Sequence, residues 1–292
     1  MEGRMKKVDT AVIGGTGVYK LEGITIKESI EMNTPFGKPS DSIKIVQTGN
    51  REVAFLPRHG TGHNLLPTEI PVKANIWALK NLGVERILSV SAVGSLKEQI
   101  KPRDIIIPDQ IIDRTKLRGN SFFGDGLVGH VSFADPFCKM LASYLHETIE
   151  SAGYRVHRNE TYICMEGPLF STRAESNLYR KWGGGVIGMT ALPEAKLARE
   201  AEICYVMMAL CTDYDCWKQD EEDVTIDMVV ENLRANNRTA GIIVQRFVQN
   251  LPDDTSCTCH SAAQYAFITE KDSIPDSVKN KLSLFYGKYW DE

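Results

Sequence analysis

The sequence predicts an α/β fold with a central mixed, twisted sheet flanked by helices. Short β-rich runs alternate with segments of helical period along most of the 292 residues, which is the pattern of α/β proteins. Residues 203–211 are almost wholly apolar, as expected for a strand covered on both faces. No internal repeat or Pro/Gly/Ser-rich linker breaks the alternation, so we predict a single domain over residues 1–292.

The predicted strands are β-branched or apolar runs bounded by turn residues. The Gly49-Asn50 pair is a hairpin signal, because both residues adopt positive φ angles readily. The predicted strands cover residues 8–13, 43–46, 53–56, 86–90, 105–107 with 111–112, 162–165, 186–189 and 203–211.

The predicted helices combine a start signal with apolar side chains at helical spacing. We place Pro71 in the first turn of one helix and Asp135 at the N-cap of another. The longest helix carries one apolar face with Asn237 as its polar interruption. Residues 1–7 are read as an N-terminal extension. The predicted helices cover residues 68–82, 135–153 and 171–182, a segment starting at 193–194, residues 226–251, and a surface helix and tail within 253–292.

Composition and charge exclude several classes of protein. There are 34 basic and 38 acidic side chains, so the chain lacks the broad positive field used to bind nucleic acid. The longest apolar run spans about nine residues, short of the ~18 of a membrane span. The opening MEGRMKK is not followed by an adequate signal-peptide core. We therefore expect a cytoplasmic protein without nucleic-acid or membrane partners.

The seven cysteines fit reduced thiols, because their number is odd and they form no spaced framework. Cys257 and Cys259 are separated by one residue, too few for a CxxC half-site, and no second half-site follows. The spacing predicts no metal site. A local disulfide between these two cysteines remains open.

The glycine cluster at residues 14–17 follows the first strand and could present backbone N–H groups to an anion. It is not a dinucleotide-binding GxGxxG, because Lys20 occupies the position of the third glycine, and the Walker pattern is missing too. Two readings stay open: a loop that offers the Thr16 hydroxyl to an anion, or a tight turn at the strand exit.

Arg58 and His59 directly follow another predicted strand, where α/β sheets place ligand-binding loops. Arginine can bind phosphate oxygens in a bidentate manner, although an arginine at a strand end is often only a solvated charge. His63 could pair with His59 around a metal, but no third ligand stands nearby. We favour an anion site.

Two acidic residues after the apolar strand, Asp213 and Asp215, can converge on one ligand. As hydrogen-bond acceptors they suit the donor edge of adenine, its amino group and a protonated N7. In the alternative reading Asp213 caps the next turn. Together with residues 91–95 and Met189-Thr190, these strand ends predict one polar crevice.

The sequence resembles the 5′-methylthioadenosine phosphorylases, members of the trimeric class of purine nucleoside phosphorylases, from about residue 8 to residue 248. The resemblance implies the phosphorylase/hydrolase-like α/β fold in a single nucleoside phosphorylase domain. It rests on GGTG (14–17), NTPFGKPSD (33–41), RHG (58–60), ANIWALK (74–80), EGPLFSTRAES (166–176), GMTALPEAKLA (188–198) and LCTDYDCWK (210–218).

The family resemblance implies a role for each matched residue. Met189 would lie under the ribose, and His130 would reach into a neighbouring subunit. The phosphate ligands would be Thr16, Arg58, His59, Ser91, Ala92 and Thr190; the base would be surrounded by Phe170, Ser171, Asp213, Tyr214 and Asp215; the 5′-methylthio pocket would be formed by His63, Ile226, Val229 and Ile268.

The implied reaction is phosphorolysis of methylthioadenosine to adenine and 5-methylthioribose 1-phosphate, in purine and methionine salvage. Asp215 is the candidate general acid with Asp213 beside it, phosphate is a co-substrate, and no metal or cofactor is required. We expect a homotrimer, or a dimer of trimers. The alternatives are a purine nucleoside phosphorylase that also accepts adenosine, inosine or methylthioinosine, a hydrolase, and a non-catalytic nucleoside-binding protein.

The resemblance has further implications for specificity and for the cysteines. Asp213 and Ser171 favour adenine, because relatives that prefer 6-oxopurines carry Asn and Glu at these positions. The Cys257/Cys259 pair resembles one that forms a disulfide in thermophilic archaeal relatives.

Overall fold

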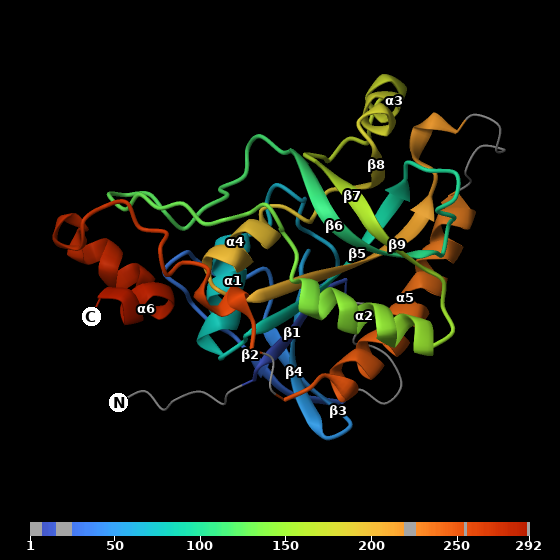
Figure 1. Ribbon diagram of the computed structural model, residues 1–292. Helices are drawn as coiled ribbons and strands as arrows, with labels where there is room; N and C mark the ends of the chain where they lie inside the picture. The colour runs from blue at the N-terminus through green and yellow to red at the C-terminus, as the bar shows by residue number, and fades with distance from the viewer. Residues whose placement is uncertain (1–7, 16–24, 219–225, 254–255, 291–292) are drawn as a thin grey trace.

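The computed structural model describes residues 8–15, 25–218, 226–253 and 256–290. Within them, nine strands form one mixed sheet with helices packed on both of its faces (Figure 1). The strands are β1 (Thr10–Gly14), β2 (Thr25–Ile30), β3 (Ile43–Thr48), β4 (Arg51–Pro57), β5 (Arg86–Ser95), β6 (Ile105–Arg114), β7 (Val156–Met165), β8 (Gly184–Gly188) and β9 (Cys204–Asp213). The α-helices are α1 (Val72–Asn81), α2 (Lys139–Ser151), α3 (Arg173–Lys181), α4 (Glu194–Glu200), α5 (Ile226–Asn250) and α6 (Asp276–Trp290).

The sheet closes on itself around β5. Its strand order is β2-β3-β4-β1-β5-β8-β7-β6-β9, and β9 also pairs with β5, so five strands form a barrel from which the others extend. β5 is parallel to β1 and β9 but antiparallel to β8. The predicted mixed α/β sheet flanked by helices is confirmed.

The strand register brings several loops to one edge of the sheet. β1, β4, β5 and β9 run parallel, so their carboxyl ends point the same way. Gly14 lies opposite Pro57, and Gly94 lies opposite Asp213. The loops that follow these four strands carry most of the chemically interesting residues of the sequence.

Two large clusters of buried apolar side chains join the sheet to its helices. Helices α1, α4 and α6 pack on one of them, and α2 and α5 pack on the other. Strand β9 is buried over almost its whole length, as its apolar composition predicts. Burial of both faces of this strand fixes the position of its polar carboxyl end.

Several predicted boundaries are wrong. Pro71 is the N-cap of α1, not a residue of its first turn. α2 begins at Lys139 with Cys138 as its N-cap, whereas Asp135 forms an exposed ion pair with Lys139. Pro136 therefore precedes the helix. The hairpin at residues 49–50 is confirmed, since β3 and β4 pair in antiparallel register up to Thr48 and Arg51.

The longest helix and the C-terminal segment also differ from the prediction. The polar residue that faces the core from α5 is Asn236, whose side-chain amide donates to the Cys211 carbonyl (2.9 Å), while Asn237 is exposed. α6 is not a surface helix, because Leu282, Phe285 and Tyr286 are buried in the core beside α1 and α4.

Among the described residues, none of the helices combines the length and apolar character needed to cross a bilayer. The proposed N-terminal extension, residues 1–7, lies outside the described residues.

Candidate active site

The loop that follows β1 lies beside Arg58. The Arg58 backbone N–H donates to the Gly14 carbonyl (3.0 Å), and β1 and β4 are adjacent in the sheet. Gly14, the first glycine of the predicted anion loop, thus lies next to Arg58, as the sequence predicts. Thr16, the hydroxyl residue of this loop, lies outside the described residues.

Arg58 is buried in an ion pair that the sequence did not reveal. Its Nε and Nη2 donate to the two carboxylate oxygens of Glu194, at 2.9 and 3.0 Å, and both side chains are at most 3% exposed. Nη2 also contacts the hydroxyl of Ser89 (2.7 Å), and Nη1 donates to the Val90 carbonyl (2.9 Å). A guanidinium has five N–H groups, and these bonds leave Nη1 a second hydrogen.

Glu194 stabilises the charge of Arg58 and is held by other donors as well. Its Oε1 accepts hydrogen bonds from the Ser89 and Tyr205 hydroxyls, each at 2.8 Å. Burial opposes the charge of Arg58, but the adjacent carboxylate outweighs it, so the pKa of Arg58 is raised. The sequence identified Glu194 only as a helix start, because nothing in its local spacing indicates a partner in β4.

His59 and His63 stack on one another, with ring centroids 4.3 Å apart. The Nδ1 of His59 lies 2.8 Å from the Leu65 carbonyl, so Nδ1–H donates and Nε2 is left as an acceptor. Burial lowers the pKa of His59, and the neighbouring Arg58 charge acts in the same direction. A neutral His59 can therefore accept a proton or a hydrogen bond.

Ser91 and Thr190 come together from different strands. Their hydroxyl oxygens lie 2.8 Å apart, because β8 runs antiparallel to β5 and its exit returns toward Ser91. Ser91 is nearly buried, while Ala92 beside it is exposed. Two hydroxyls next to an open backbone segment can bind an anion. Ser91 directly follows Val90, whose carbonyl accepts a hydrogen bond from Arg58 Nη1, so the hydroxyl pair lies close to Arg58.

Arg118 holds the segment that carries Met189 and Thr190. Its Nη1 donates to the carbonyls of Met189 and Leu192, both at 2.6 Å, and its Nε pairs with Glu166 (3.0 Å). The side chain is only 4% exposed. Sequence reasoning missed Arg118, since an arginine between two predicted elements carries no local signal of such contacts.

Asp213 and Asp215 lie together at the end of β9. Asp213 Oδ1 accepts the Asp215 backbone N–H (2.9 Å), and Oδ2 accepts the Thr212 hydroxyl (2.6 Å). Among the described residues, the buried Oδ2 of Asp215 has no hydrogen-bond partner. Burial raises the pKa of Asp215 and the negative charge of Asp213 adds to the rise, while the Ser176 hydroxyl and the Cys216 backbone N–H act in the opposite direction.

The backbone around this acid pair is unusual. Asp215 has a φ of 46°, a left-handed conformation that aspartate tolerates better than most residues. Gly94 lies against the pair, since a Cβ there would stand 3.1 Å from Asp213 Oδ1. The turn is also tied to β5 by the Trp217 indole N–H, which donates to the Ser95 carbonyl (2.8 Å).

The loop between β7 and α3 approaches the acid pair from another side. The Ser171 carbonyl accepts a hydrogen bond from the Cys216 thiol (3.2 Å), so buried Ser171 lies next to the turn that carries Asp215. Phe170 is 83% exposed. Tyr214 points elsewhere: its ring packs edge-on against Trp217, and its hydroxyl contacts the Glu98 carbonyl.

Four predicted residues remain, two on the segments around Gly129 and Phe267 and two on α5. His130 and Ile268 are exposed, and they sit on two segments that pair with each other through Gly129 and Phe267. The chain between β6 and α2 extends away from the sheet toward the side of α6 before it returns to α2 (Figure 1). Ile226 and Val229 belong to α5, but their side chains lie outside what the structure describes.

A hydroxyl pair and an acid pair thus occupy the same edge of the sheet. Ser91 and Gly94 are three residues apart on β5, which corresponds to about 10 Å along a strand. A nucleoside lying along this edge could reach both groups. The hydroxyl pair suits an anion, and the acid pair suits a hydrogen-bond donor or a group that takes up a proton.

A family model of the phosphorylase superfamily matches residues 9–249. The S-methyl-5′-thioadenosine phosphorylase of Koribacter versatilis (strain Ellin345) is 51% identical over 98% of this chain and 98% of its own length. A methylthioadenosine phosphorylase from an Antarctic soil metagenomic library is structurally similar, with a TM-score of 0.92 and 45% identity over 96% of this chain and 99% of its own.

A more distant relative has been solved with ligands. The methylthioadenosine phosphorylase of Schistosoma mansoni in complex with adenine has a TM-score of 0.82 at 33% identity, covering 92% of this chain and 100% of its own. A mutant of the adenosine/methylthioadenosine phosphorylase of that organism was solved with methylthioadenosine. The chain belongs to the phosphorylase superfamily, in the family of the S-methyl-5′-thioadenosine phosphorylases.

Proposed function

We propose that the protein catalyses the phosphorolysis of 5′-methylthioadenosine. An oxygen of inorganic phosphate forms a bond to C1′ of the ribose, the bond from C1′ to N9 breaks, and the purine takes up a proton at N7. The products are adenine and 5-methylthioribose 1-phosphate. No metal or organic cofactor takes part in these steps, and residues 1–292 act as one nucleoside phosphorylase domain.

The phosphate end of the proposed site is built from the hydroxyl pair and the loops beside it. Ser91 and Thr190, 2.8 Å apart, donate to phosphate oxygens together with the Ala92 backbone. His59 Nε2, which is left as an acceptor, accepts from the P–OH group of the phosphate, and Arg58 offers the remaining hydrogen of Nη1. Thr16 completes the set from the loop after β1. Holding phosphate close to C1′ accelerates the reaction by positioning and by opposing the positive charge of the sugar.

The base end of the proposed site is the acid pair. Asp215 in its protonated form donates to N7, and negative charge on the leaving purine is neutralised as the proton moves. Asp213, whose carboxylate oxygens accept the Asp215 N–H and the Thr212 hydroxyl, also accepts from the adenine amino group. Ser171 and Phe170 line the rest of the base site, and Tyr214 contributes only through its backbone, because its side chain points toward Glu98.

The ribose would lie between the phosphate end and the base end, and its 5′-methylthio group would extend beyond them. Met189, whose backbone Arg118 fixes, lies under the ribose. His63, Ile226, Val229 and Ile268 form the methylthio pocket, where an apolar wall favours sulfur over a 5′-hydroxyl by burial of apolar surface.

We propose a homotrimer, with a dimer of trimers as the alternative assembly, in which His130 enters a neighbouring subunit's site. Large apolar side chains exposed on one chain support this assembly, since such surface is costly in water. They include Leu117 (84%), Leu169 (82%), Phe170 (83%) and Tyr265 (90%).

The observation that carries the proposal is the buried Asp215 Oδ2, which lacks a partner among the described residues and lies beside the Asp213 carboxyl group. Such an oxygen suits a proton donor aimed at a ligand. The acid pair also sets specificity, because 6-oxopurines offer an acceptor at C6 and would leave Asp213 opposed by another acceptor. We expect a tenfold to hundredfold preference for 6-aminopurines, about 1–3 kcal/mol.

Product analysis with and without phosphate tests the function. The purified protein should convert methylthioadenosine to adenine and 5-methylthioribose 1-phosphate only when phosphate is present. Release of free methylthioribose without phosphate would identify a hydrolase, and ligand binding without turnover would identify a nucleoside-binding protein. Equal or faster turnover of methylthioinosine would favour the broader purine nucleoside phosphorylase.

A further inference from the structure

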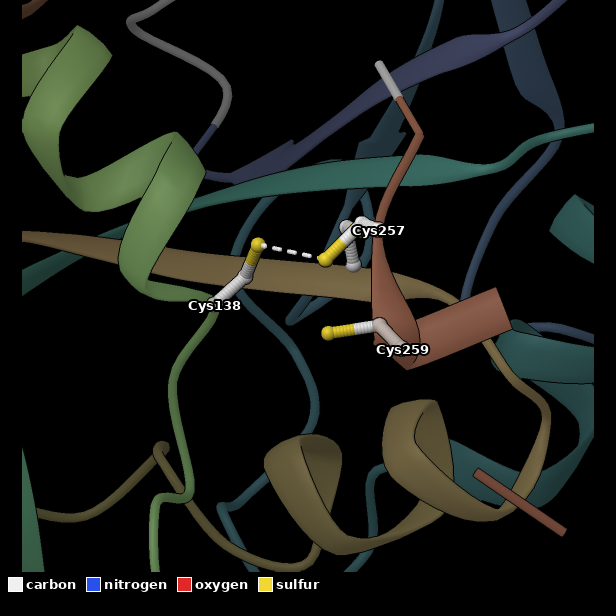
Figure 2. A group of neighbouring side chains, drawn as sticks. Cys138, Cys257 and Cys259 are labelled. Carbon is white, nitrogen blue, oxygen red and sulfur yellow. Dashed lines mark hydrogen bonds between the residues drawn. The ribbon is translucent and has the colours of Figure 1, made fainter. Parts of the chain in front are cut away.

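Four cysteines from three separate parts of the chain meet at the amino end of β9. Cys138 precedes α2, Cys204 is the first residue of β9, and Cys257 and Cys259 lie in the segment between α5 and α6. All four sulfur atoms lie within 4.8 Å of one another. Figure 2 shows the sulfur atoms of Cys138, Cys257 and Cys259 turned toward a common centre.

The distances match a metal site better than a disulfide. The Sγ atoms of Cys138 and Cys257 are 3.6 Å apart, whereas a disulfide requires about 2.0 Å. Four thiolates at about 2.3 Å from a tetrahedral zinc ion stand about 3.8 Å from one another. The cluster therefore has about the size of a tetrathiolate zinc site.

The backbone around the cluster holds its parts together. The Cys138 N–H donates to the Tyr205 carbonyl (2.8 Å), which pins the start of α2 against β9. Cys204 N–H donates to the Glu85 carbonyl (2.9 Å) within the sheet. The His260 N–H donates to the Cys257 carbonyl (3.1 Å) and forms a tight turn around Cys259. Such pre-positioned ligands lower the cost of metal binding.

A helix N-terminus, an imidazole ring and two basic side chains lie near the sulfur atoms. Cys138 stands at the N-terminus of the 13-residue helix α2, where the helix dipole favours a thiolate. His260 Nε2 lies 3.7 Å from Cys204 Sγ. The side chains of Lys80 and Arg199 interact electrostatically with Cys204 and Cys259. Zinc bound to four thiolates carries a net charge of −2, which the helix dipole and the charges of Lys80 and Arg199 oppose.

We infer that Cys138, Cys204, Cys257 and Cys259 bind one structural zinc ion. On binding, the four thiols release their protons and the four sulfur atoms each form one bond to Zn²⁺, with no change of oxidation state. The sequence does not predict this site, because its spacing shows only the Cys257/Cys259 pair. The fold supplies the second pair from positions 138 and 204.

The zinc would fasten the C-terminal segment to the sheet. Cys257 and Cys259 belong to the stretch that leads to Phe267 and then to α6, and Phe267 pairs with Gly129. Fixing this stretch at its start would hold α6 and the neighbouring loop in place. The zinc would act on folding and stability, and the inference stands independently of the proposed reaction.

Metal analysis of the full-length protein tests the inference. After purification without chelators, we expect about one zinc per chain, as for a closed structural site. Replacement by Co²⁺ should give the visible d–d bands and near-ultraviolet charge-transfer absorption of a tetrahedral tetrathiolate. Removal of zinc by a chelator should lower the melting temperature, and added Zn²⁺ should restore it.

Variants locate the metal. Cys257→Ala and Cys259→Ala should reduce bound zinc at least tenfold, whereas Cys164→Ala, a buried cysteine of β7 outside the cluster, should keep it. Cys257 is only half-buried, so its variant is the one least expected to disturb folding, which circular dichroism checks.

Three results would overturn the inference. One is seven titratable thiols in the freshly unfolded protein with no bound metal. Another is a disulfide within the cluster, found by mass spectrometry of protein purified under nitrogen. The third is iron in place of zinc at the same stoichiometry.

Discussion

Asp213 Oδ1 accepts the backbone N–H of Asp215 at 2.9 Å, so one carboxylate of the pair fixes the position of the other. Asp213 is thereby supplied with hydrogen-bond donors, whereas the buried Oδ2 of Asp215 has no partner among the described residues. Two acids two residues apart thus have different environments, and this difference assigns them different roles in the proposed reaction.

Asp215→Asn should lower kcat for phosphorolysis of methylthioadenosine by about 100-fold or more, the usual loss on removal of a general acid. Asparagine tolerates the left-handed φ of 46° at this position, so the turn should be preserved. Steady-state kinetics at saturating phosphate measure the effect. Asp109→Asn, at an exposed site on β6, serves as the control and should leave kcat unchanged.

The same substitution should stabilise the protein at neutral pH. Burial raises the pKa of Asp215 above its ordinary value of 3.8, so the folded state holds this proton more tightly than the unfolded state. Its contribution to stability is full below pH 3.8 and is lost as the pH rises through the folded pKa.

An asparagine side chain cannot ionise, so Asp215→Asn should have a higher melting temperature than the wild type at neutral pH. The difference should shrink as the pH falls toward the ordinary pKa of aspartate. Thermal unfolding across this range measures the difference. A gap that widens on acidification would contradict the raised pKa of Asp215.

Ser91→Ala and Thr190→Val should each raise the KM for phosphate by about 10- to 100-fold, because hydrogen bonds to a charged group contribute about 1.5–3 kcal/mol. The two hydroxyls contact each other at 2.8 Å, so the double variant should lose less than the product of the single effects. Ser29→Ala, on exposed β2, is the control. Unchanged phosphate KM in both single variants would place the anion elsewhere.

Glu194→Ala should lower the free energy of unfolding by about 3–5 kcal/mol, the cost of leaving a buried charge without its partner. Arg58 and Glu194 are at most 3% exposed. Glu231→Ala breaks an exposed ion pair with Arg103, in which the Arg103 and Glu231 side chains are 52% and 72% accessible, and should cost about 0–1 kcal/mol. Urea denaturation compares the two. Equal losses would show that Glu194 is not required to compensate Arg58.

Local patterns in the sequence predict much of the fold. The apolar run that becomes β9 and the turn signal between β3 and β4 are properties of neighbouring residues, and both predictions are confirmed. Element ends are less well predicted, because the packing of Cys138 against β9, not the Asp135-Pro136 signal, sets the start of α2.

Long-range contacts could not be predicted in this way. The closure of the barrel by β9 on β5, the ion pair between Arg58 and Glu194, and the meeting of four cysteines all join positions far apart in the sequence. Nothing in the local spacing of these residues records their partners. The motifs of the family located the strand-end residues, but they did not reveal that Arg58 is buried against a carboxylate.

The central claim is that Asp215 transfers a proton to N7 of the purine. A substrate that needs no such proton tests this claim most directly. A methylthioadenosine analogue methylated at N7 already carries the positive charge that protonation would supply. The ratio of wild-type to Asp215→Asn turnover should be about 100 or more with methylthioadenosine and fall to near one with the analogue. A loss of the same size on both substrates would contradict the assignment of Asp215 as the general acid.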